Sequence, residues 1–226
     1  MIGSALATIL GTVIALLPIA NPFSTAALFL GLTTGQSSEE REVQARRACL
    51  YMAAILITFL VAGTLIMRLF GISLPGIRMA GGLMVAMIGF RMLHPAEEED
   101  VSEDVKRDSR RRDDISFMPL AMPSLSGPGA IAVTIGLAAQ SEGVINHIAI
   151  AVGIIASAAV CYFALRAATP VVKFLGPTGL DALTRIMGFL LLCIGVQFIV
   201  TGVNGFITDP SFLEALIEAL EAVQTP

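Results

Sequence analysis

Six long apolar stretches run along the 226-residue chain, and short polar, glycine-containing or proline-containing segments separate them. The stretches cover roughly residues 4–34, 45–69, 76–93, 115–140, 144–167 and 182–206. The hydrocarbon core of a bilayer requires about 20 apolar residues per helix. The pattern therefore predicts an all-α, polytopic membrane protein with six transmembrane spans.

The first and fourth spans are each interrupted by a pentapeptide that prolines frame. Pro18-Ile19-Ala20-Asn21-Pro22 interrupts the first span, and Pro119-Leu120-Ala121-Met122-Pro123 interrupts the fourth. A broken helix inside a bilayer leaves peptide groups unpaired, which costs several kcal/mol per group unless protein, water or ligand satisfies them. We therefore expect both spans to be broken near the midplane, where recurring breaks point to a transporter's binding site. The alternative is a pair of proline kinks that neighbouring helices satisfy.

The two halves of the chain repeat each other beyond these pentapeptides. Phe70-Gly71 followed by Arg78 in the first half matches Leu175-Gly176 followed by Arg185 in the second, and glycines follow both arginines. Each half then consists of a broken helix, a full helix and a helix that starts near an arginine. Because three spans are an odd number, the second repeat is predicted to be inverted relative to the first.

This organisation divides the chain into four parts. Residues 1–93 form the first three-helix repeat, 94–114 a linker, 115–207 the second repeat and 208–226 a tail. The linker is acidic and then mainly basic, which predicts a disordered, charged segment between the repeats. The tail has apolar and glutamate positions at helical spacing after Asp209-Pro210, so we expect a short amphipathic helix on the outer surface.

The distribution of charge predicts an orientation. The sequence is 55% hydrophobic and 14% charged, with a net charge of -4. Its acidic residues lie in the loops, outside the apolar cores, so the net charge gives no indication of nucleic acid as a partner. Twelve of the lysines and arginines fall on one set of loops and helix ends, and only Arg68 and Arg78 fall on the other. The positive-inside rule then puts both termini away from the cytoplasm and the 94–114 loop inside it.

Two local patterns make further structural predictions. Ser37 and Glu40 have the spacing of a capping box, so the second helix is expected to begin before the bilayer does. Ala149, Gly153 and Ser157 recur every four residues, which predicts that the fifth helix approaches a neighbour closely.

The half-helices that follow the two breaks carry the candidate binding chemistry. Residues 22–34 and 128–140 both begin with proline, which suits a helix start because its missing N–H costs nothing there. In inverted repeats, both would present free N–H groups and a positive dipole end to one central spot, which favours a carboxylate. The carbonyl ends of the preceding half-helices favour an ammonium group or a cation, so a zwitterion suits the site. The candidate substrate-binding residues are Asn21, Pro22, Ser24, Thr25, Ser124, Ser126, Gly127, Pro128 and Gly129.

Other polar residues in the spans each have two interpretations. Gln197, Thr201 and Asn204 recur at helical spacing on the sixth span, and they either hold helices together or line a pathway. Arg78 and Arg185 start equivalent helices, and they either reach the lipid headgroups or act as gates on opposite faces.

The spans lack the residues that several function classes require. No Asp or Glu falls near the middle of a span, which argues against a proton relay through a membrane carboxylate. A zinc-protease helix, a nucleophile elbow and a Walker loop are all absent, so we do not expect an enzyme or an ATP-driven pump. The three cysteines have no zinc spacing, and we predict no metal site and no cofactor. Sodium could still be held by unwound carbonyls and by the serine and threonine hydroxyls of the breaks.

Four segments of the chain resemble signature segments of the MarC family of bacterial inner-membrane proteins. They are residues 18–32, 70–82, 119–129 and 185–191. The resemblance implies a six-helix protein of the bacterial inner membrane that is related to amino-acid exporters and to transporters of small neutral amino acids. In that membrane, the orientation predicted from the charges makes both termini periplasmic. It assigns substrate contact to Asn21, Pro22, Ser24, Ser126, Gly127, Pro128 and Gly129. Ala27 departs from the family, because many members have a proline there.

Together these observations predict a secondary transporter of small neutral, zwitterionic amino acids or similar solutes. Substrate would bind at the paired half-helix N-termini, and the repeats would alternate access to it across the bilayer. Efflux of apolar drugs is an alternative, for which ten methionines and twelve phenylalanines could form an adaptable pocket. A non-transporting membrane scaffold is another. The chain could also form oligomers.

Overall fold

The computed structural model describes residues 2–94, 114–141, 143–210 and 214, and within these ranges it contains helices and no strands. The helices are α1 (Ile2–Ala20), α2 (Pro22–Leu32), α3 (Ser38–Phe70), α4 (Leu74–Leu93), η1 (Ser116–Leu125), α6 (Pro128–Gln140), α7 (Val144–Arg166) and α8 (Ala168–Ile207). Five of them are long and apolar enough to cross a membrane, and η1 with α6 forms a sixth candidate span bent by 61°. The prediction of an all-α polytopic fold is confirmed for this part of the chain. The predicted linker at 94–114 and tail helix at 208–226 fall largely outside the described residues.

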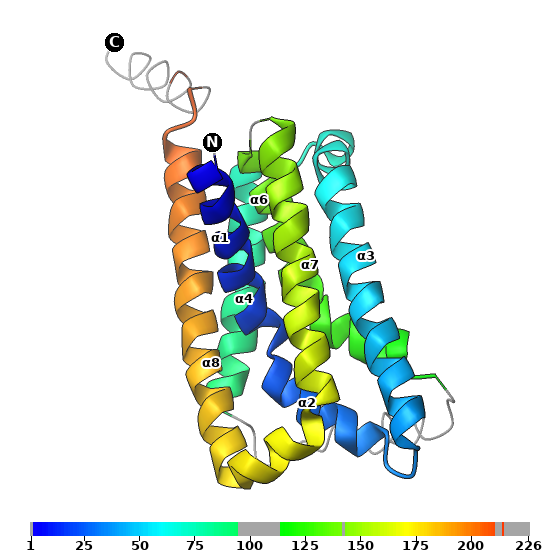
Figure 1. Cartoon of the computed structure of the whole chain (residues 1–226). Coiled ribbons are helices and arrows are strands. Elements are labelled where there is room, and N and C mark those ends of the chain that lie inside the picture. Colours follow the sequence, from blue (N-terminus) through cyan, green and yellow to red (C-terminus); the bar gives the residue numbers. More distant parts are fainter. Residues whose placement is uncertain (1, 95–113, 142, 211–213, 215–226) are drawn as a thin grey trace, which may run out of the picture.

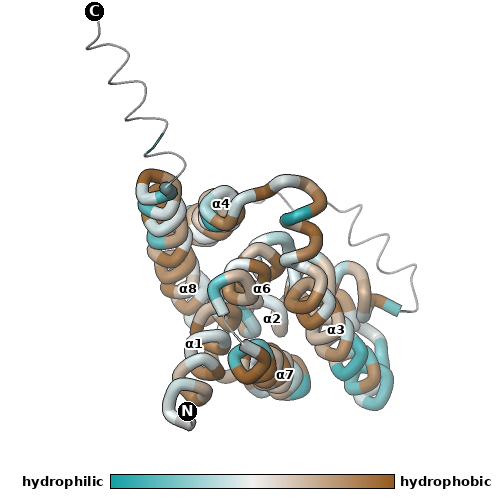
Figure 2. The backbone as a smooth tube through the Cα atoms, turned by 90° about the horizontal axis from the view of Figure 1, so that it is seen from above, coloured by the Kyte–Doolittle hydropathy of each residue, from teal (hydrophilic) through white to brown (hydrophobic). Residues whose placement is uncertain are grey.

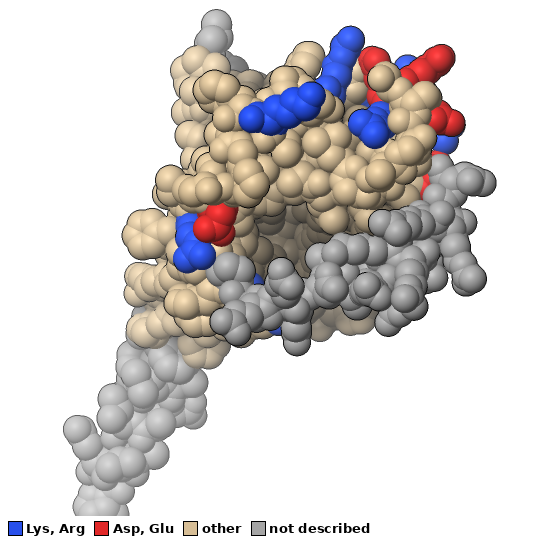
Figure 3. Space-filling view, turned by 90° about the horizontal axis from the view of Figure 1, so that it is seen from below, with Lys and Arg blue, Asp and Glu red and all other residues tan. Residues whose placement is uncertain are grey.

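The helices form one bundle with two distinct ends (Figure 1). The end that carries residue 2, residue 207 and the turns α3–α4 and α6–α7 is called the terminal end here. The opposite end carries the α2–α3 turn, residues 94 and 114 and the α7–α8 corner, and it is called the basic end. Lysine and arginine side chains lie around this face when it is seen from below (Figure 3). The membrane face that each end meets stays a prediction.

The interior is apolar, and so is much of the exterior. Seen along the bundle, α6 lies inside a ring of helices and packs against α1, α3, α4 and α7 (Figure 2). Leu16, Phe29 and Met52 are among the large side chains that this packing buries almost completely. Val61 and Leu69, in contrast, are each 74% exposed. Large apolar side chains on the outside of a bundle are what a lipid-facing surface requires.

Helix α3 begins where the capping pattern predicts. The Ser37 hydroxyl accepts a hydrogen bond from the Glu40 N–H, and the Glu40 carboxylate accepts one from the Ser37 N–H at 2.7 Å. These bonds satisfy two donors that a helix start otherwise leaves free. At its other end Gly71 adopts a left-handed conformation with φ 63°, which ends the helix without the penalty that a Cβ would bring.

Replacing Ser37 with alanine is expected to lower the stability of the protein by about 1 kcal/mol, because the Glu40 N–H loses its acceptor. The apparent melting temperature in detergent measures the change. Ser37→Thr is the control, since threonine keeps a capping oxygen; equal melting temperatures for the two variants would contradict the role of the cap.

Glycines line the antiparallel contact between α4 and α8, the most extensive helix pair of the bundle. A Cβ added at Gly82 would lie 2.6 Å from the carbonyl oxygen of Gly195, and one at Gly89 would lie 2.6 Å from that of Gly188. The two backbones approach this closely only because side chains are absent, as in other small-residue contacts between membrane helices.

These glycine pairs relate the two halves of the chain. Gly82 and Gly89 are separated by 106 positions from Gly188 and Gly195, respectively. The earlier glycine of each helix contacts the later glycine of the other. An inverted repeat would produce this pairing, although the repeat itself stays a prediction.

The small-residue stripe on α7 packs as predicted. A Cβ added at Gly153 would lie 2.6 Å from Cβ of Thr12 on α1, so these helices are in close contact. Ala149 and Ser157 on the same face are buried, and the Ser157 hydroxyl donates to the Gly153 carbonyl at 2.9 Å.

The sixth span begins differently from the prediction. We expected spans over 144–167 and 182–206 with a connection between them, whereas α8 covers Ala168–Ile207 with a sharp bend at Gly176, where φ is 63° and ψ is 177°. The residues before the bend form a helical segment along the basic end (Figure 1). The Gly176-Pro177 pair in the sequence indicates the bend. The helical segment before it, over residues 168–175, mixes apolar and polar residues, so the sequence did not predict it as part of the helix.

Candidate functional site

Asn21 makes the break between α1 and α2. It has φ 37° and ψ 69°, a left-handed conformation that no other described non-glycine residue adopts. Asparagine is one of the few side chains that tolerates this conformation, and it also caps the start of α2. Pro22 follows as the first helical residue and has no N–H, so the Pro18 carbonyl cannot receive its usual hydrogen bond. The break in the first span is confirmed, and its cause is Asn21-Pro22.

A chain of polar contacts leads from this break to α8. Asn21 Nδ2 donates to Ser24 Oγ at 2.7 Å, and Ser24 Oγ lies 2.7 Å from Thr184 Oγ1. Thr184 was not among the predicted site residues. The sequence analysis named its neighbour Arg185 as a possible gate. A single threonine in an apolar span belongs to no motif, so the sequence could not identify Thr184 as a site residue.

Thr25 takes over a hydrogen bond that the break removes. Its hydroxyl donates to the Ala20 carbonyl at 3.0 Å, and the side chain is only 5% exposed. The proton of Thr25 is therefore engaged, whereas its oxygen lone pairs remain available to a donor or a cation.

The second break, before α6, is longer. Met118 and Met122 have extended rather than helical backbone angles, and the peptide bonds from them to Pro119 and Pro123 are cis. The Ser124 hydroxyl donates to the Pro119 carbonyl and the Ser126 hydroxyl to the Ala121 carbonyl, both at 2.8 Å. The Ser124 hydroxyl thus replaces the backbone donor that Pro123 cannot supply, and the Ser126 hydroxyl adds a second hydrogen bond to the Ala121 carbonyl, which also accepts one from the Ser126 N–H at 2.9 Å.

The two breaks correspond at the starts of the helices that follow them. The prediction of a half-helix over 128–140 is confirmed, because α6 starts at Pro128, which follows Gly127 in an extended conformation. Pro128 is 106 positions after Pro22, the same separation as between the glycine pairs. Ser124, like Pro18, precedes its helix-starting proline by four residues and loses the same hydrogen bond. The helix starts at Pro22 and Pro128 therefore correspond, whereas the two proline-framed pentapeptides, which end at Pro22 and Pro123, are offset from this correspondence by five positions.

The segment that enters η1 is fixed to α3. Asp114 forms an ion pair of 2.9 Å with Arg47, and the Ile115 N–H donates to Gln44 Oε1 at 3.0 Å. Ser116 donates to Asp114 through both its hydroxyl and its N–H. These bonds from Ser116, together with the Arg47 charge, hold the pKa of Asp114 below its usual range.

The two breaks meet inside the bundle. A Cβ added at Gly129, in the first turn of α6, would lie 3.7 Å from Ile19 in the last turn of α1. From this region α2 runs toward the basic end and α6 toward the terminal end (Figure 1). With 11 and 13 residues, they extend roughly 16 and 20 Å at 1.5 Å per residue. The meeting point therefore lies well inside the bundle, with both helix starts facing it.

At this meeting point, the hydrogen-bond donors come from the starts of α2 and α6, and the acceptors come from the segments that precede them. Helix α6 has no side-chain cap, so the N–H groups of Gly129 and Ala130 have no intrahelical acceptor, and the same holds for Phe23 in α2. These donors and the two positive dipole ends suit a carboxylate. The carbonyls of Pro18 and Ser124 and the lone pairs of the hydroxyls suit an ammonium group or a sodium ion. In the described part of the chain, no group of three or more His, Cys, Asp and Glu side chains could hold another metal.

The remaining predicted residues lie apart from the breaks. Gln197 and Asn204 are exposed on α8, and Gln197 Nε2 contacts Thr201 Oγ1 at 3.4 Å on the same helix. Arg185 is exposed and pairs with Asp181 at 3.0 Å. Arg78 is half-buried next to Gly205 of α8, and its Nε is buried without a hydrogen-bond partner among the described residues. Their roles as gates or pathway residues stay predictions.

The comparisons with known proteins agree on one family. A model of the "MarC family integral membrane protein" matches residues 6–207. The inner membrane protein MarC of Citrobacter koseri is 43% identical over 205 residues, which are 86% of this chain and 92% of that protein. MarC of Salmonella typhimurium is 43% identical over 209 residues, and MarC of Escherichia coli UTI89 is 43% identical over 205, with the same coverage. No solved structure matches the chain.

Proposed function

We propose that this chain, which belongs to the MarC family of integral membrane proteins, is a secondary transporter of small neutral amino acids. The observation that carries the proposal is the meeting of two interrupted helices, whose free N–H groups and unpaired carbonyls point to a ligand with both charges. Such helix ends occur at a cost that a bound ligand offsets.

The chemistry of the breaks favours a substrate whose only charges are its carboxylate and ammonium groups. The side chains at the breaks are hydroxyls, an amide and apolar groups, and no described ionisable side chain belongs to either break. A charged substrate side chain would find no counter-ion there. Glycine, alanine, serine and threonine are therefore the first candidates, and we expect transport without enzymatic conversion.

Alternating access would use the contacts already described. Asn21 and Gly127 would be the points about which α2 and α6 tilt, and the smooth glycine contact between α4 and α8 would let the halves rock. Names of the relatives support a location in the inner membrane. The excess of basic residues then supports a cytoplasmic basic end and periplasmic termini.

A flux panel tests the proposal. Purified protein in proteoliposomes would be supplied with labelled glycine, alanine, serine and threonine, and with apolar drugs, under sodium and proton gradients imposed separately. We expect saturable exchange of at least one amino acid. Drug flux alone, or no flux from protein shown to be folded, would contradict the proposal.

Thr184→Val is expected to lower amino-acid transport about tenfold, because Ser24 loses its partner on α8 and the polar chain from Asn21 ends. Valine has the same shape, so the protein should remain folded. Thr58→Val is the matched control, since the Thr58 hydroxyl binds only the Ala54 carbonyl of its own helix on an exposed face. Initial rates in proteoliposomes compare the two, and equal rates would remove Thr184 from the site.

A further inference from the structure

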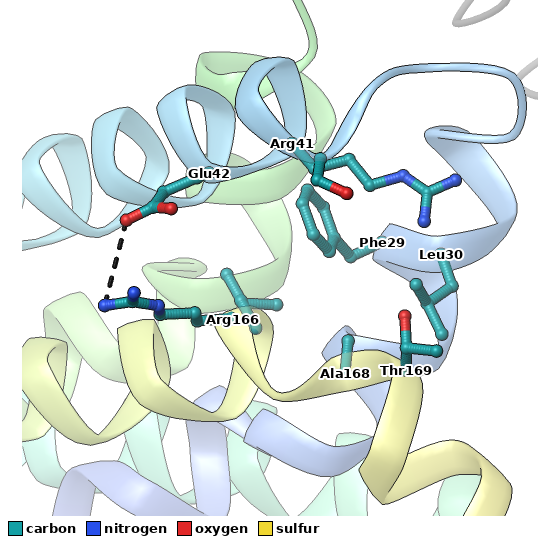
Figure 4. A pocket seen from close by; sticks show the side chains of 9 residues that line it. Phe29, Leu30, Arg41, Glu42, Arg166, Ala168 and Thr169 are labelled. Carbon is teal, nitrogen blue, oxygen red and sulfur yellow. Dashed lines mark ion pairs between the residues drawn. The ribbon is translucent and has the colours of Figure 1, made fainter.

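A polar cavity lies at the basic end, and its α2 residues are about 10–12 Å along the helix from the break. It encloses about 220 Å³ where the end of α2, the start of α3 and the corner between α7 and α8 meet. Figure 4 shows the side chains that line it, with Glu42 and Arg166 facing each other across one side. The volume equals about seven water molecules at ~30 Å³ each, which is enough for a small amino acid and some water.

Charged side chains of both signs line this cavity, and the ion pair between them is too long for a hydrogen bond. Arg166 Nη1 lies 3.8 Å from Glu42 Oε1, which is an ion pair but not a hydrogen bond. The Glu42 oxygen instead accepts a hydrogen bond of 3.1 Å from Tyr162. Both charged side chains are about half exposed, at 57% for Arg166 and 49% for Glu42, so a ligand can reach them.

Arg41 is held in place on the other side of the cavity. Its Nε and Nη2 donate to the Thr33 carbonyl at 3.3 and 3.0 Å, which ties it to the end of α2. Its third nitrogen, Nη1, has no hydrogen-bond partner in the part of the chain that the structure describes. Arg41 therefore adds a fixed positive charge to this side of the cavity, which favours the entry of a carboxylate.

We propose that this cavity is a second binding site for the zwitterion, which the substrate occupies when it enters or leaves through the basic end. Arg166 holds its carboxylate, Glu42 holds its ammonium group, and Phe29 and Leu165 contact its side chain. The proposal rests on the proposed transport function and adds a site to it.

The position of α2 connects this cavity to the break. Phe29, which is only 2% exposed, lines the cavity from α2, and the same helix starts at Pro22. A tilt of α2 about Asn21 would therefore change both sites together. The corresponding place at the terminal end, beside the end of α6, is a cavity of about 400 Å³ lined by Arg68 but by no carboxylate. We therefore expect the zwitterion to be recognised at the basic end and not at its counterpart.

Sided transport with two variants tests this site. Initial rates of labelled alanine uptake would be measured in everted and in right-side-out membrane vesicles, with propionate as an inhibitor that has the carboxylate but no ammonium group. Glu42→Gln is expected to raise the KM for alanine about three- to tenfold on the face of the basic end only, and to leave inhibition by propionate unchanged. Arg166→Gln is expected to weaken both alanine and propionate on that face. Arg91→Gln, an exposed arginine at the same end, is the control.

The outcomes separate this site from the transport function itself. If the unaltered protein moves no amino acid in either kind of vesicle, the transport function is wrong and this site falls with it. If it transports alanine but both variants keep the unaltered KM on both faces, the second site is wrong and the transport function stands. Equal changes on both faces would also contradict the second site, because they would indicate a general structural effect.

Discussion

Replacing Gly195 with alanine is expected to lower the apparent melting temperature of the protein in detergent by at least about 5 °C. The added Cβ would lie 2.5 Å from the Ala86 nitrogen and 2.6 Å from the Gly82 carbonyl oxygen. Both are backbone atoms, which cannot turn aside as a side chain can, so α4 and α8 must separate along their whole contact. Overpacking of this kind costs about 1–3 kcal/mol even where side chains can adjust.

The control for this prediction is another glycine in a membrane helix. Gly11 is exposed on α1, and a Cβ there would have no atom within 4 Å. Gly11→Ala should therefore stabilise the protein by up to about 1 kcal/mol, since alanine is the better helix former. A loss of stability in Gly11→Ala as large as in Gly195→Ala would show that the close contact of α4 and α8 is not the cause.

Replacing Asn21 with aspartate is expected to reduce amino-acid transport about a hundredfold while the protein keeps its fold. Aspartate tolerates a left-handed conformation and caps a helix as well as asparagine does, so the break between α1 and α2 should persist. The new carboxylate, however, would compete for the N–H groups that face the meeting point and would repel a substrate carboxylate there. A hundredfold loss corresponds to about 2.7 kcal/mol.

This variant also separates two readings of the site. If the paired helix starts hold the substrate carboxylate, Asn21→Asp weakens transport, and lowering the pH should restore part of it because the introduced carboxyl becomes neutral. If the site held only a cation, the same variant would bind its ligand more tightly. Asn21→Gly, which keeps the backbone conformation but removes the side chain, should give an intermediate rate. Proteoliposome flux and melting temperature, measured together, check all of these expectations.

The candidate site also has a consequence for how the bundle moves. The hydroxyl protons of Thr25, Ser124 and Ser126 are all engaged with carbonyls of their own segments. These side chains therefore stabilise the interrupted backbone whether or not a ligand is bound. Ser24 differs, because its contact reaches Thr184 on α8 and links the first break to a helix of the other half. A ligand that changes this contact would act on the α4–α8 layer as well as on α2.

The sequence by itself determined the helices and the places where they break. Runs of apolar residues predicted the spans, Ser37 and Glu40 predicted the start of α3, and the prolines predicted both interruptions. These features depend on interactions between residues a few positions apart, such as capping bonds and missing N–H groups. Local chemistry of this kind is readable from the order of residues.

Only the tertiary structure decided which residues meet. It brought Thr184 to Ser24, packed Gly129 at the start of α6 against Ile19 at the end of α1, and placed Glu42 and Arg166 on one cavity. It also left Gln197 and Asn204 exposed, away from the breaks. These outcomes depend on how deeply each helix is set and how it is rotated against its neighbours, as the glycine contacts between α4 and α8 illustrate. The spacing of residues along one helix carries no information about the partner that packs against it.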